Sequence, residues 1–173
     1  MPANGKRPSN CATGQPRHPR VTIETIESFL AGSPPSLHTL PAAANVLDAL
    51  RLMANQEVGA VLVVDGATLS GIFSERDFAR ISLAVDPSPS TLVLGAAMSK
   101  CPALAKPEDT LQHCLVLMEE HQVEYMPVLI DDIPIGLVSR SQLQQAVIAQ
   151  YERVFRELEL DWSLLFIQGV YSC

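Results

Sequence analysis

The sequence lacks three features that would each define a broad class of protein. Its four cysteines, at positions 11, 101, 114 and 173, include no Cys-x-x-Cys pair and have no histidine partner at a metal-ligand spacing, so we expect neither a zinc site nor a disulfide framework. No apolar run approaches the roughly 18 residues that a membrane span needs, and the N-terminus has no apolar centre of a secretory signal. We therefore expect a reduced, cytoplasmic protein with no metal site and no membrane anchor.

Positive charge is also scarce. The chain has 12 Lys and Arg residues against 19 Asp and Glu residues, a net charge of −7. Broad binding to nucleic acid or to anionic membranes needs a basic face, so both are disfavoured, although a local basic pocket is compatible with this charge. With 173 residues and 47% hydrophobic content, the chain can bury one core, or two small halves that share one.

The first 21 residues differ in composition from the rest of the chain. Residues 1–20 contain no acidic residue and carry four basic residues, which also fits a transit peptide. Their proline and glycine content makes a poor amphipathic helix, so residues 1–21 are predicted to be a disordered tail.

An internal repeat organises the remainder. Gly71–Asp77 reads Gly-Ile-Phe-Ser-Glu-Arg-Asp, and Gly136–Gln142, 65 positions later, reads Gly-Leu-Val-Ser-Arg-Ser-Gln. At the same offset 46–81 and 111–146 share seven identical residues in all, and the order of element types repeats as well. The identical pairs are Leu50 and Leu115, Leu52 and Leu117, Met53 and Met118, Val58 and Val123, Val63 and Val128, Gly71 and Gly136, and Ser74 and Ser139.

Each repeat is predicted to be a β-α-β-β-α unit. Apolar spacing predicts an initial helix, a short extended piece, an amphipathic helix opened by a proline, a Val-rich strand, a tight turn, a second strand and a second helix. In the first repeat these lie at 22–31, 37–40, after Pro41, 60–64, 65–66, 69–73 and 75–83. In the second they lie at 92–98, 103–105, after Pro107, 125–130, 131–132, 134–138 and from Arg140.

The predicted fold class is α/β (α+β), with the two repeats packed as a pseudo-twofold pair because neither half covers its sheet alone. The predicted domains are the tail 1–21, a first repeat at 22–86, a second repeat at 91–150, and a C-terminal helix with a docked apolar tail at 151–173. The seam Val147, Tyr151, Val154 and Leu158 of that helix should bury against the chain's own body or a second subunit.

Residues 22–150 resemble a tandem pair of cystathionine-β-synthase-type domains, called CBS domains. The resemblance is most specific in Gly71–Asp77, Val123–Val128 and Gly136–Ser139. The ending Ile167–Tyr171 is similar to the tails of small stand-alone CBS-pair proteins, to which no catalytic domain is attached.

The resemblance implies a homodimeric regulatory module that binds an adenine nucleotide, such as AMP, ADP or ATP, or another adenosyl compound between its repeats. It implies that Ser74 contacts phosphate or ribose and that Asp77 takes the ribose hydroxyls. A carboxylate can accept from both hydroxyls of a diol, the helix N-terminus offers N–H groups to phosphate, and Arg76 can add charge there. The remaining expected ligand contacts are Lys100, Cys101, Pro102, Tyr125, Met126 and Pro127.

The second repeat departs from the family pattern. Ser139 is retained, but Gln142 stands in place of the aspartate, so diol recognition should be weaker there. In the first repeat Leu62 stands where a proline is usual, whereas the second repeat has Pro127. We therefore expect one good site and one degraded site.

Simpler roles exist for the same residues. Ser74 or Ser139 could only cap the helix that follows, Asp77 could lie exposed in a first turn, and Arg76 could form a surface ion pair.

Three function classes follow from this reading. A ligand-sensing module that acts on an unidentified partner protein is favoured. The alternative is a dimerisation or scaffold protein that kept the fold and lost ligand affinity. An enzyme is disfavoured, because the sequence offers no activated nucleophile or acid–base pair.

Overall fold

The structure is a computed structural model that describes the backbone of residues 24–32, 37–83 and 89–169, and side chains as far as Arg156. The predicted disordered tail and the predicted docking of the apolar C-terminal side chains lie outside the described residues. The chain divides into a unit at Ile23–Arg153, which holds every strand that the structure describes, and a second unit that contains Val154–Cys173.

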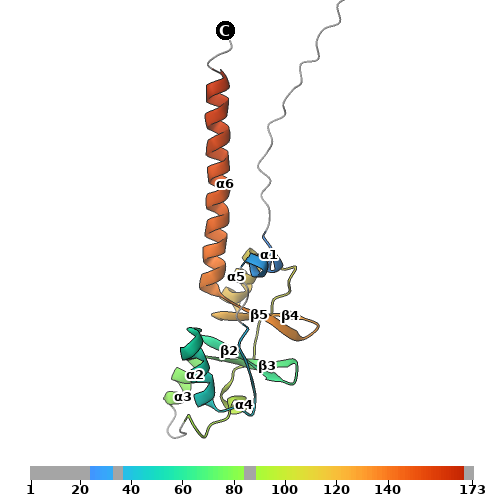
Figure 1. The fold of residues 1–173 in the computed structure, drawn as a ribbon, viewed down its shortest axis with the longest axis vertical. Helices are drawn as coiled ribbons and strands as arrows, with labels where there is room; N and C mark the ends of the chain where they lie inside the picture. Colours follow the sequence, from blue (N-terminus) through green and yellow to red (C-terminus); the bar gives the residue numbers. More distant parts are fainter. Residues whose placement is uncertain (1–23, 33–36, 84–88, 170–173) are drawn as a thin grey trace, which may run out of the picture. The chain divides into compact units, whose positions relative to one another are not determined.

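The first repeat forms a three-stranded sheet with helices around it (Figure 1). Strand β1 pairs in parallel with β2, and β2 pairs antiparallel with β3. Helix α2 packs its buried face, Val46, Ala49 and Met53, against this sheet, as the predicted apolar stripe requires. The bounds are β1 Thr39–Pro41, α2 Val46–Gln56, β2 Ala60–Asp65, β3 Thr68–Ser74 and α3 Glu75–Ser82.

The second repeat has the same order of elements. Strands β4 and β5 form an antiparallel hairpin, and a single parallel bridge, Ala105 to Val128, stands where the first repeat has β1. The bounds are α4 Leu94–Ala97, α5 Leu111–Glu120, β4 Tyr125–Ile130, β5 Ile133–Ser139 and α6 Arg140–Gly169, and α1, at the start of the first repeat, is Ile26–Gly32.

The offset of 65 residues also holds in the local geometry. Helices α2 and α5 are each followed by a residue with positive φ, Glu57 at 53° and Gln122 at 54°. The strand register shifts after Val63 in the first hairpin and after Val128 in the second. The predicted repeat and fold class are confirmed at the level of individual backbone features.

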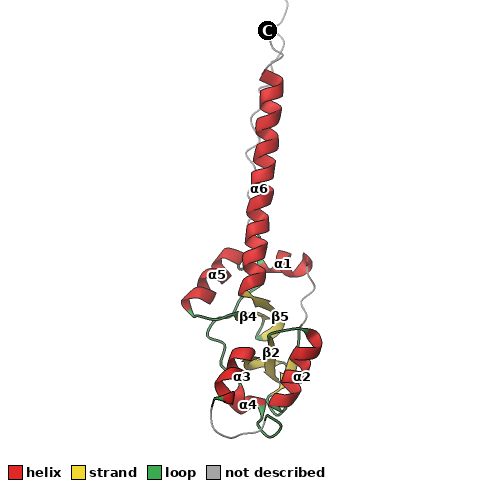
Figure 2. Ribbon diagram, turned by 90° about the vertical axis from the view of Figure 1, so that its left-hand side faces the viewer, coloured by secondary structure: helices red, strands yellow, loops and turns green. Residues whose placement is uncertain are grey.

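The initial helices are exchanged between the repeats (Figure 2). Ile26 of α1 is fully buried in the core of the second repeat, with Leu111 of α5 as a neighbour in that core. Leu94 and Ala97 of α4 are buried in the core of the first repeat. The repeats of the sequence are therefore not the packing units, because each repeat's core is completed by the initial helix of the other repeat.

Two helix starts differ from the predicted ones. Pro41 was predicted to open α2, but it pairs with Val64 as the last residue of β1, and α2 begins at Val46. Pro107 was predicted to open α5, which begins at Leu111 because Thr110 is its N-cap and accepts a hydrogen bond from the His113 N–H at 3.1 Å.

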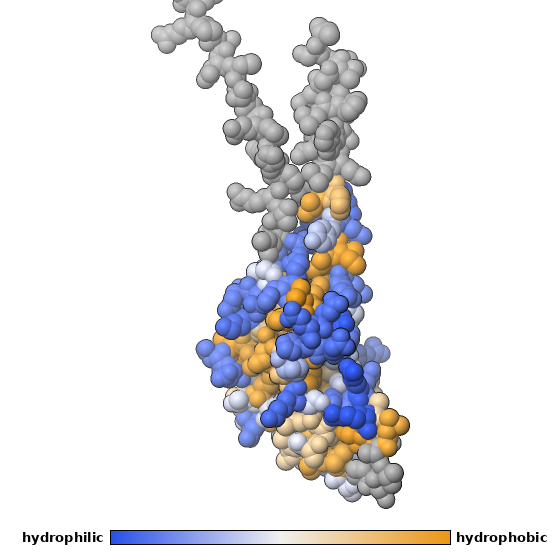
Figure 3. Space-filling view, turned by 180° about the vertical axis from the view of Figure 1, so that it is seen from behind, coloured by the Kyte–Doolittle hydropathy of each residue, from blue (hydrophilic) through white to orange (hydrophobic). Residues whose placement is uncertain are grey.

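Helix α6 continues well beyond the second repeat, as expected. The predicted seam is partly covered: Val147 packs on the core of the second repeat, whereas Tyr151 is 54% exposed. Ile148 and Phe155 are also exposed, and Figure 3 shows apolar surface along the described part of α6. Within the part of the chain that the structure describes, no helix is both long and apolar enough to span a bilayer.

The exchange of α1 predicts that Ile26→Ala destabilises the protein although it lies outside the second repeat in sequence. Loss of a fully buried isoleucine should lower the free energy of unfolding by about 2–5 kcal/mol. Chemical denaturation measures this, with Val116→Ala as control, because Val116 is apolar but 53% exposed and its truncation should cost under about 0.5 kcal/mol. Equal, small effects of the two substitutions would contradict the exchange.

Candidate functional site

A cavity of about 750 Å³ lies where the two repeats meet. Three segments far apart in the sequence line it: the end of β3 with the start of α3, the residues after α4, and the turn before β4. The lining residues are Ile72, Ser74, Glu75, Arg76, Asp77, Arg80, Ser99, Lys100, Cys101, Pro102, Gln122, Val123, Glu124 and Tyr125.

A capping box fixes the strand-to-helix junction at the cavity. Ser74 is the N-cap of α3, and its hydroxyl accepts a hydrogen bond from the Asp77 N–H at 3.4 Å. In return, Asp77 Oδ2 accepts from the Ser74 N–H at 2.9 Å and from the Ser74 hydroxyl at 2.7 Å. This reciprocal arrangement satisfies backbone donors that a helix start would otherwise leave open.

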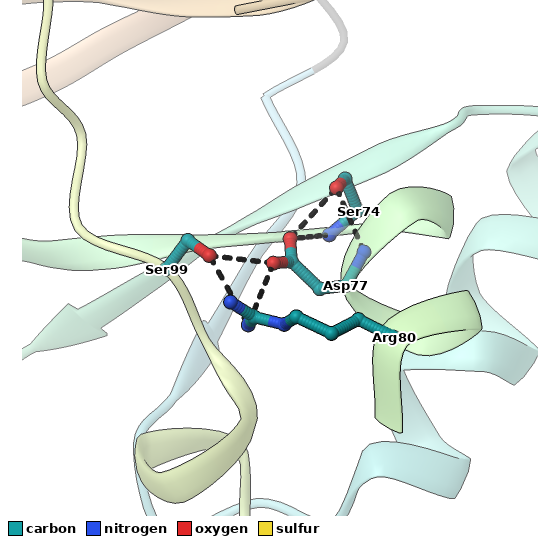
Figure 4. Close-up of polar contacts among 4 residues, drawn as sticks. All are labelled: Ser74, Asp77, Arg80 and Ser99. Atoms are coloured by element: carbon teal, nitrogen blue, oxygen red, sulfur yellow. Dashed lines mark hydrogen bonds and ion pairs between the residues drawn. The ribbon is translucent and has the colours of Figure 1, made fainter. Parts of the chain in front are cut away.

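The second carboxylate oxygen of Asp77 is also occupied (Figure 4). Asp77 Oδ1 accepts from Arg80 Nη2 at 3.1 Å and from the Ser99 hydroxyl at 2.5 Å. Arg80 Nη2 lies 3.3 Å from the Ser99 hydroxyl as well. Asp77 is consequently only 6% exposed, so it is not the exposed first-turn residue of the simpler alternative.

Two of the first three N–H groups of α3, those of Glu75 and Asp77, have partners within the protein. Besides the Ser74 and Asp77 N–H groups, the Glu75 N–H donates to the Gly59 carbonyl at 3.1 Å. These two N–H groups are therefore not available to a phosphate, so phosphate binding at this cavity would depend more on side chains.

Three cationic side chains at the cavity are candidates to bind a phosphate. Arg76, Arg80 and Lys100 all line the cavity and all are exposed. Arg76 Nη1 also donates to the Gln122 carbonyl at 3.3 Å, a hydrogen bond that joins the two repeats. Three carboxylates, Glu75, Asp77 and Glu124, line the same cavity, so its formal charges balance although the chain as a whole is acidic. An anion would therefore be attracted to the cationic side chains themselves and not to the cavity as a whole.

The cavity's thiol and phenol are held in their neutral forms. Burial, followed by the negative charge of Asp77, raises the pKa of Cys101 to about 11. Burial, followed by the charges of Glu75 and Glu124, raises the pKa of Tyr125. The Cys101 thiol and the Tyr125 phenol are therefore neutral at physiological pH, and they line the cavity rather than act as nucleophiles. Among the described residues, no three His, Cys, Asp or Glu side chains are placed to hold a metal ion.

A second cavity of about 280 Å³ occupies the position related by the 65-residue offset. Tyr125 lines both cavities, and a Cβ added to Gly59 would overlap the Tyr125 hydroxyl, so glycine is needed for this close approach. No Lys or Arg occurs among the described residues that line the second cavity. Those residues are Glu57, Val58, Gly59, Ala60, Glu124, Tyr125, Leu137, Ser139, Ser141 and Gln142.

The start of α6 repeats the cap of α3 with an amide. Gln142 Oε1 accepts from the Ser139 N–H and from the Ser139 hydroxyl, both at 3.0 Å, and the Gln142 N–H donates back to the hydroxyl at 3.3 Å. Gln142 is exposed, whereas Asp77 is buried. The aspartate and the glutamine thus serve the same cap, and they differ in charge and in surroundings.

The structure brings most of the predicted site residues together. Ser74, Arg76, Asp77, Lys100, Cys101, Pro102 and Tyr125 line the first cavity, and Ser139 lines the second. Met126 and Pro127 line neither: Met126 is fully buried in the core of the second repeat, and Pro127 pairs with Leu137 inside the hairpin.

Two residues that contact Asp77 were missed. Arg80 lies three residues after Asp77, on the same face of a helix, and this spacing could have identified it. Ser99 reaches Asp77 because its backbone bridges to Ile72 of β3, a contact between segments that sequence spacing does not reveal.

Comparisons with known proteins agree with this architecture. The CBS domain family model matches residues 34–84 and 94–149. The mitochondrial CBS domain-containing protein CBSX3 of Arabidopsis thaliana is 29% identical over 131 residues, which is 73% of this chain and 61% of that protein. The chain therefore spans less than two thirds of the length of that relative.

Solved structures show the same fold. A protein with CBS domains from Burkholderia ambifaria has 33% identity and a TM-score of 0.68, over 73% of this chain and 95% of that one. The CBS domain pair of protein MJ0100, solved with 5′-methylthioadenosine and S-adenosyl-L-methionine, has 17% identity and a TM-score of 0.64, over 75% and 99%. Because the two family matches cover more than half of the chain and fall on its two repeats, the chain belongs to the CBS domain family.

Proposed function

We propose that this chain is a regulatory CBS-pair module that binds an adenine nucleotide or another adenosyl ligand in the larger cavity. The observation that carries the proposal is the combination of a buried carboxylate, Asp77, with three exposed cations in a cavity between the repeats. A carboxylate suits a ribose diol, and a cluster of cations suits phosphate.

The cavity's size and walls support this ligand class. Its volume of about 750 Å³ falls in the usual range for small-molecule sites. Ile72, Pro102 and Val123 supply apolar surface for a planar base, and Tyr125 adds an aromatic face. MJ0100, which shares the fold, was solved with two adenosyl compounds.

The second cavity is proposed to bind such ligands poorly. It is smaller, its described lining contains no cation, and Gln142 takes the place of the aspartate. A neutral amide has one acceptor oxygen, which here already serves the cap of α6. One ligand for each chain is therefore the proposed stoichiometry.

Signalling follows from the position of the larger cavity. A ligand there contacts segments of both repeats, including Ser74 from the first and Tyr125 from the second. It also lies beside the Arg76–Gln122 hydrogen bond between them. A ligand that binds two arrangements of the repeats unequally shifts the balance between them, and the changed surface acts on a partner protein in the cytoplasm.

Thermal unfolding with AMP, ADP, ATP, NAD, NADH and S-adenosylmethionine tests the proposal. A ligand at 100 times its dissociation constant adds about 2.7 kcal/mol to the stability of the folded state, which should raise Tm by about 5 °C or more. Asp77→Asn should remove the shift without unfolding the protein, because Gln142 demonstrates that an amide supports this cap. Gln142→Ala is the matched control and should retain the shift.

Two results would count against the proposal. An undiminished shift in Asp77→Asn would remove Asp77 from the ligand site. No shift with any of the compounds at millimolar concentration would favour the alternative, a dimerisation or scaffold protein with the CBS fold. Buried Leu62, where the family usually has proline, is compatible with that alternative.

Self-association is part of both the proposed ligand-binding function and the scaffold alternative. Ile148, Tyr151 and Phe155 are apolar, more than half exposed, and carried by one helix, and such side chains are stabilised by burial against a second copy.

Replacing Tyr151 and Phe155 together with serine should therefore weaken the homodimer by more than about tenfold, because two large apolar side chains are lost from the interface. Sedimentation of the full chain measures this change. Glu152→Ser with Arg156→Ser is the control, since it removes two exposed charges of opposite sign from the same helix. Unchanged association of the serine pair at 151 and 155 would assign the dimer to another surface.

A further inference from the structure

The carboxylate of Asp77 has no free acceptor position in this structure. A carboxylate offers about four lone-pair sites. Oδ2 accepts from the N–H and the hydroxyl of Ser74, and Oδ1 accepts from Arg80 and from the hydroxyl of Ser99. A ribose diol therefore cannot bind Asp77 unless one of these donors leaves.

The four donors are not equally easy to displace. The Ser74 groups form the cap of α3, so their loss would leave the helix start unsatisfied. The Ser99 hydroxyl is partly buried and makes the shortest of the four bonds, at 2.5 Å. Arg80 makes the longest, at 3.1 Å, and its side chain is 65% exposed against 9% for Asp77.

Arg80 is therefore the donor whose displacement from Asp77 costs the least free energy. An exposed guanidinium regains hydrogen bonds to water when it leaves a carboxylate, which is why exposed ion pairs contribute little to stability. A partly buried hydroxyl or a capping N–H has no such compensation.

We propose that the ligand's ribose diol displaces Arg80 from Asp77, and that the released guanidinium then binds the ligand's phosphate. We call the Arg80–Asp77 ion pair the latch. This inference rests on the proposed function, since it takes the diol to bind at Asp77. Arg80 lines the same cavity as Arg76 and Lys100, so a guanidinium released from Asp77 stays beside the other cations.

The latch makes the cavity selective for ligands that carry both groups. A nucleoside has a diol but no phosphate, so it must break the Arg80–Asp77 pair without offering the guanidinium a new anion. A nucleotide breaks the same pair and replaces it with a charge-assisted bond to its phosphate. Arg80 is thus a specificity-determining residue, distinct from a cation that only adds positive charge.

Calorimetric titration of the full chain and of Arg80→Ala with adenosine and with AMP tests the latch. Without the competing donor, adenosine should bind about threefold tighter, whereas AMP should bind about threefold or more weaker because a phosphate partner is lost. Arg76→Ala is the matched control, since it removes one cation from the same cavity but its guanidinium bonds to Gln122. It should weaken AMP and leave adenosine unchanged. 2′,3′-Dideoxyadenosine, which has no diol, should bind the wild type and Arg80→Ala with the same affinity.

The outcomes separate the two proposals. If AMP binds the wild-type chain and Arg80→Ala affects the two ligands as Arg76→Ala does, the latch is wrong and the proposed function stands. The latch would also be wrong if Arg80→Ala raised the affinity for dideoxyadenosine as much as the affinity for adenosine, because the increase would then not depend on the diol. If neither adenosine nor AMP nor any other compound of the thermal-unfolding panel binds the wild type or Arg80→Ala, the proposed function fails and the latch fails with it.

Discussion

Each repeat of this chain depends on the other for a complete core. Ile26, at the start of the first repeat, is buried in the core of the second, and Leu94, at the start of the second, is buried in the core of the first. Separating the repeats would expose both side chains to water, and each buried side chain of this size contributes about 1.5–3 kcal/mol. The exchange therefore keeps the repeats together while leaving a cavity of about 750 Å³ at their boundary. A site in that position contacts both halves of an interlocked unit, which is where a bound molecule has most effect on their packing.

The two related cavities differ in their cationic lining and in the side chain that completes a shared cap. Asp77 and Gln142 each accept from the N–H and hydroxyl of a serine at a helix start. The aspartate has a second oxygen, which draws in Arg80 and Ser99 and buries the carboxylate, whereas the glutamine has no second acceptor and stays exposed. The two repeats therefore share the geometry of the helix cap and differ in the charge of the side chain that completes it.

The sequence was sufficient for the order of the elements, because the apolar periods and the 65-residue offset are local patterns. It placed the helix starts too early at Pro41 and Pro107, because the residues that follow those prolines extend to the N-caps Asn45 and Thr110 before either helix begins. The exchange of α1 and α4 was not predictable, since it depends on contacts between segments distant in the chain. The same holds for Ser99 beside Asp77. Ser74 and Asp77 were recognised from a motif, but the motif does not reveal that both carboxylate oxygens already have donors.

The central claim is that one asymmetric cavity, built around Asp77, is the ligand site of this CBS pair. Isothermal titration of the full chain with AMP tests it most directly, because the stoichiometry reports how many of the two related cavities bind. The account predicts one molecule of AMP for each chain. Two equivalent molecules for each chain, or no binding at millimolar concentration by AMP or any other compound of the thermal-unfolding panel, would contradict it.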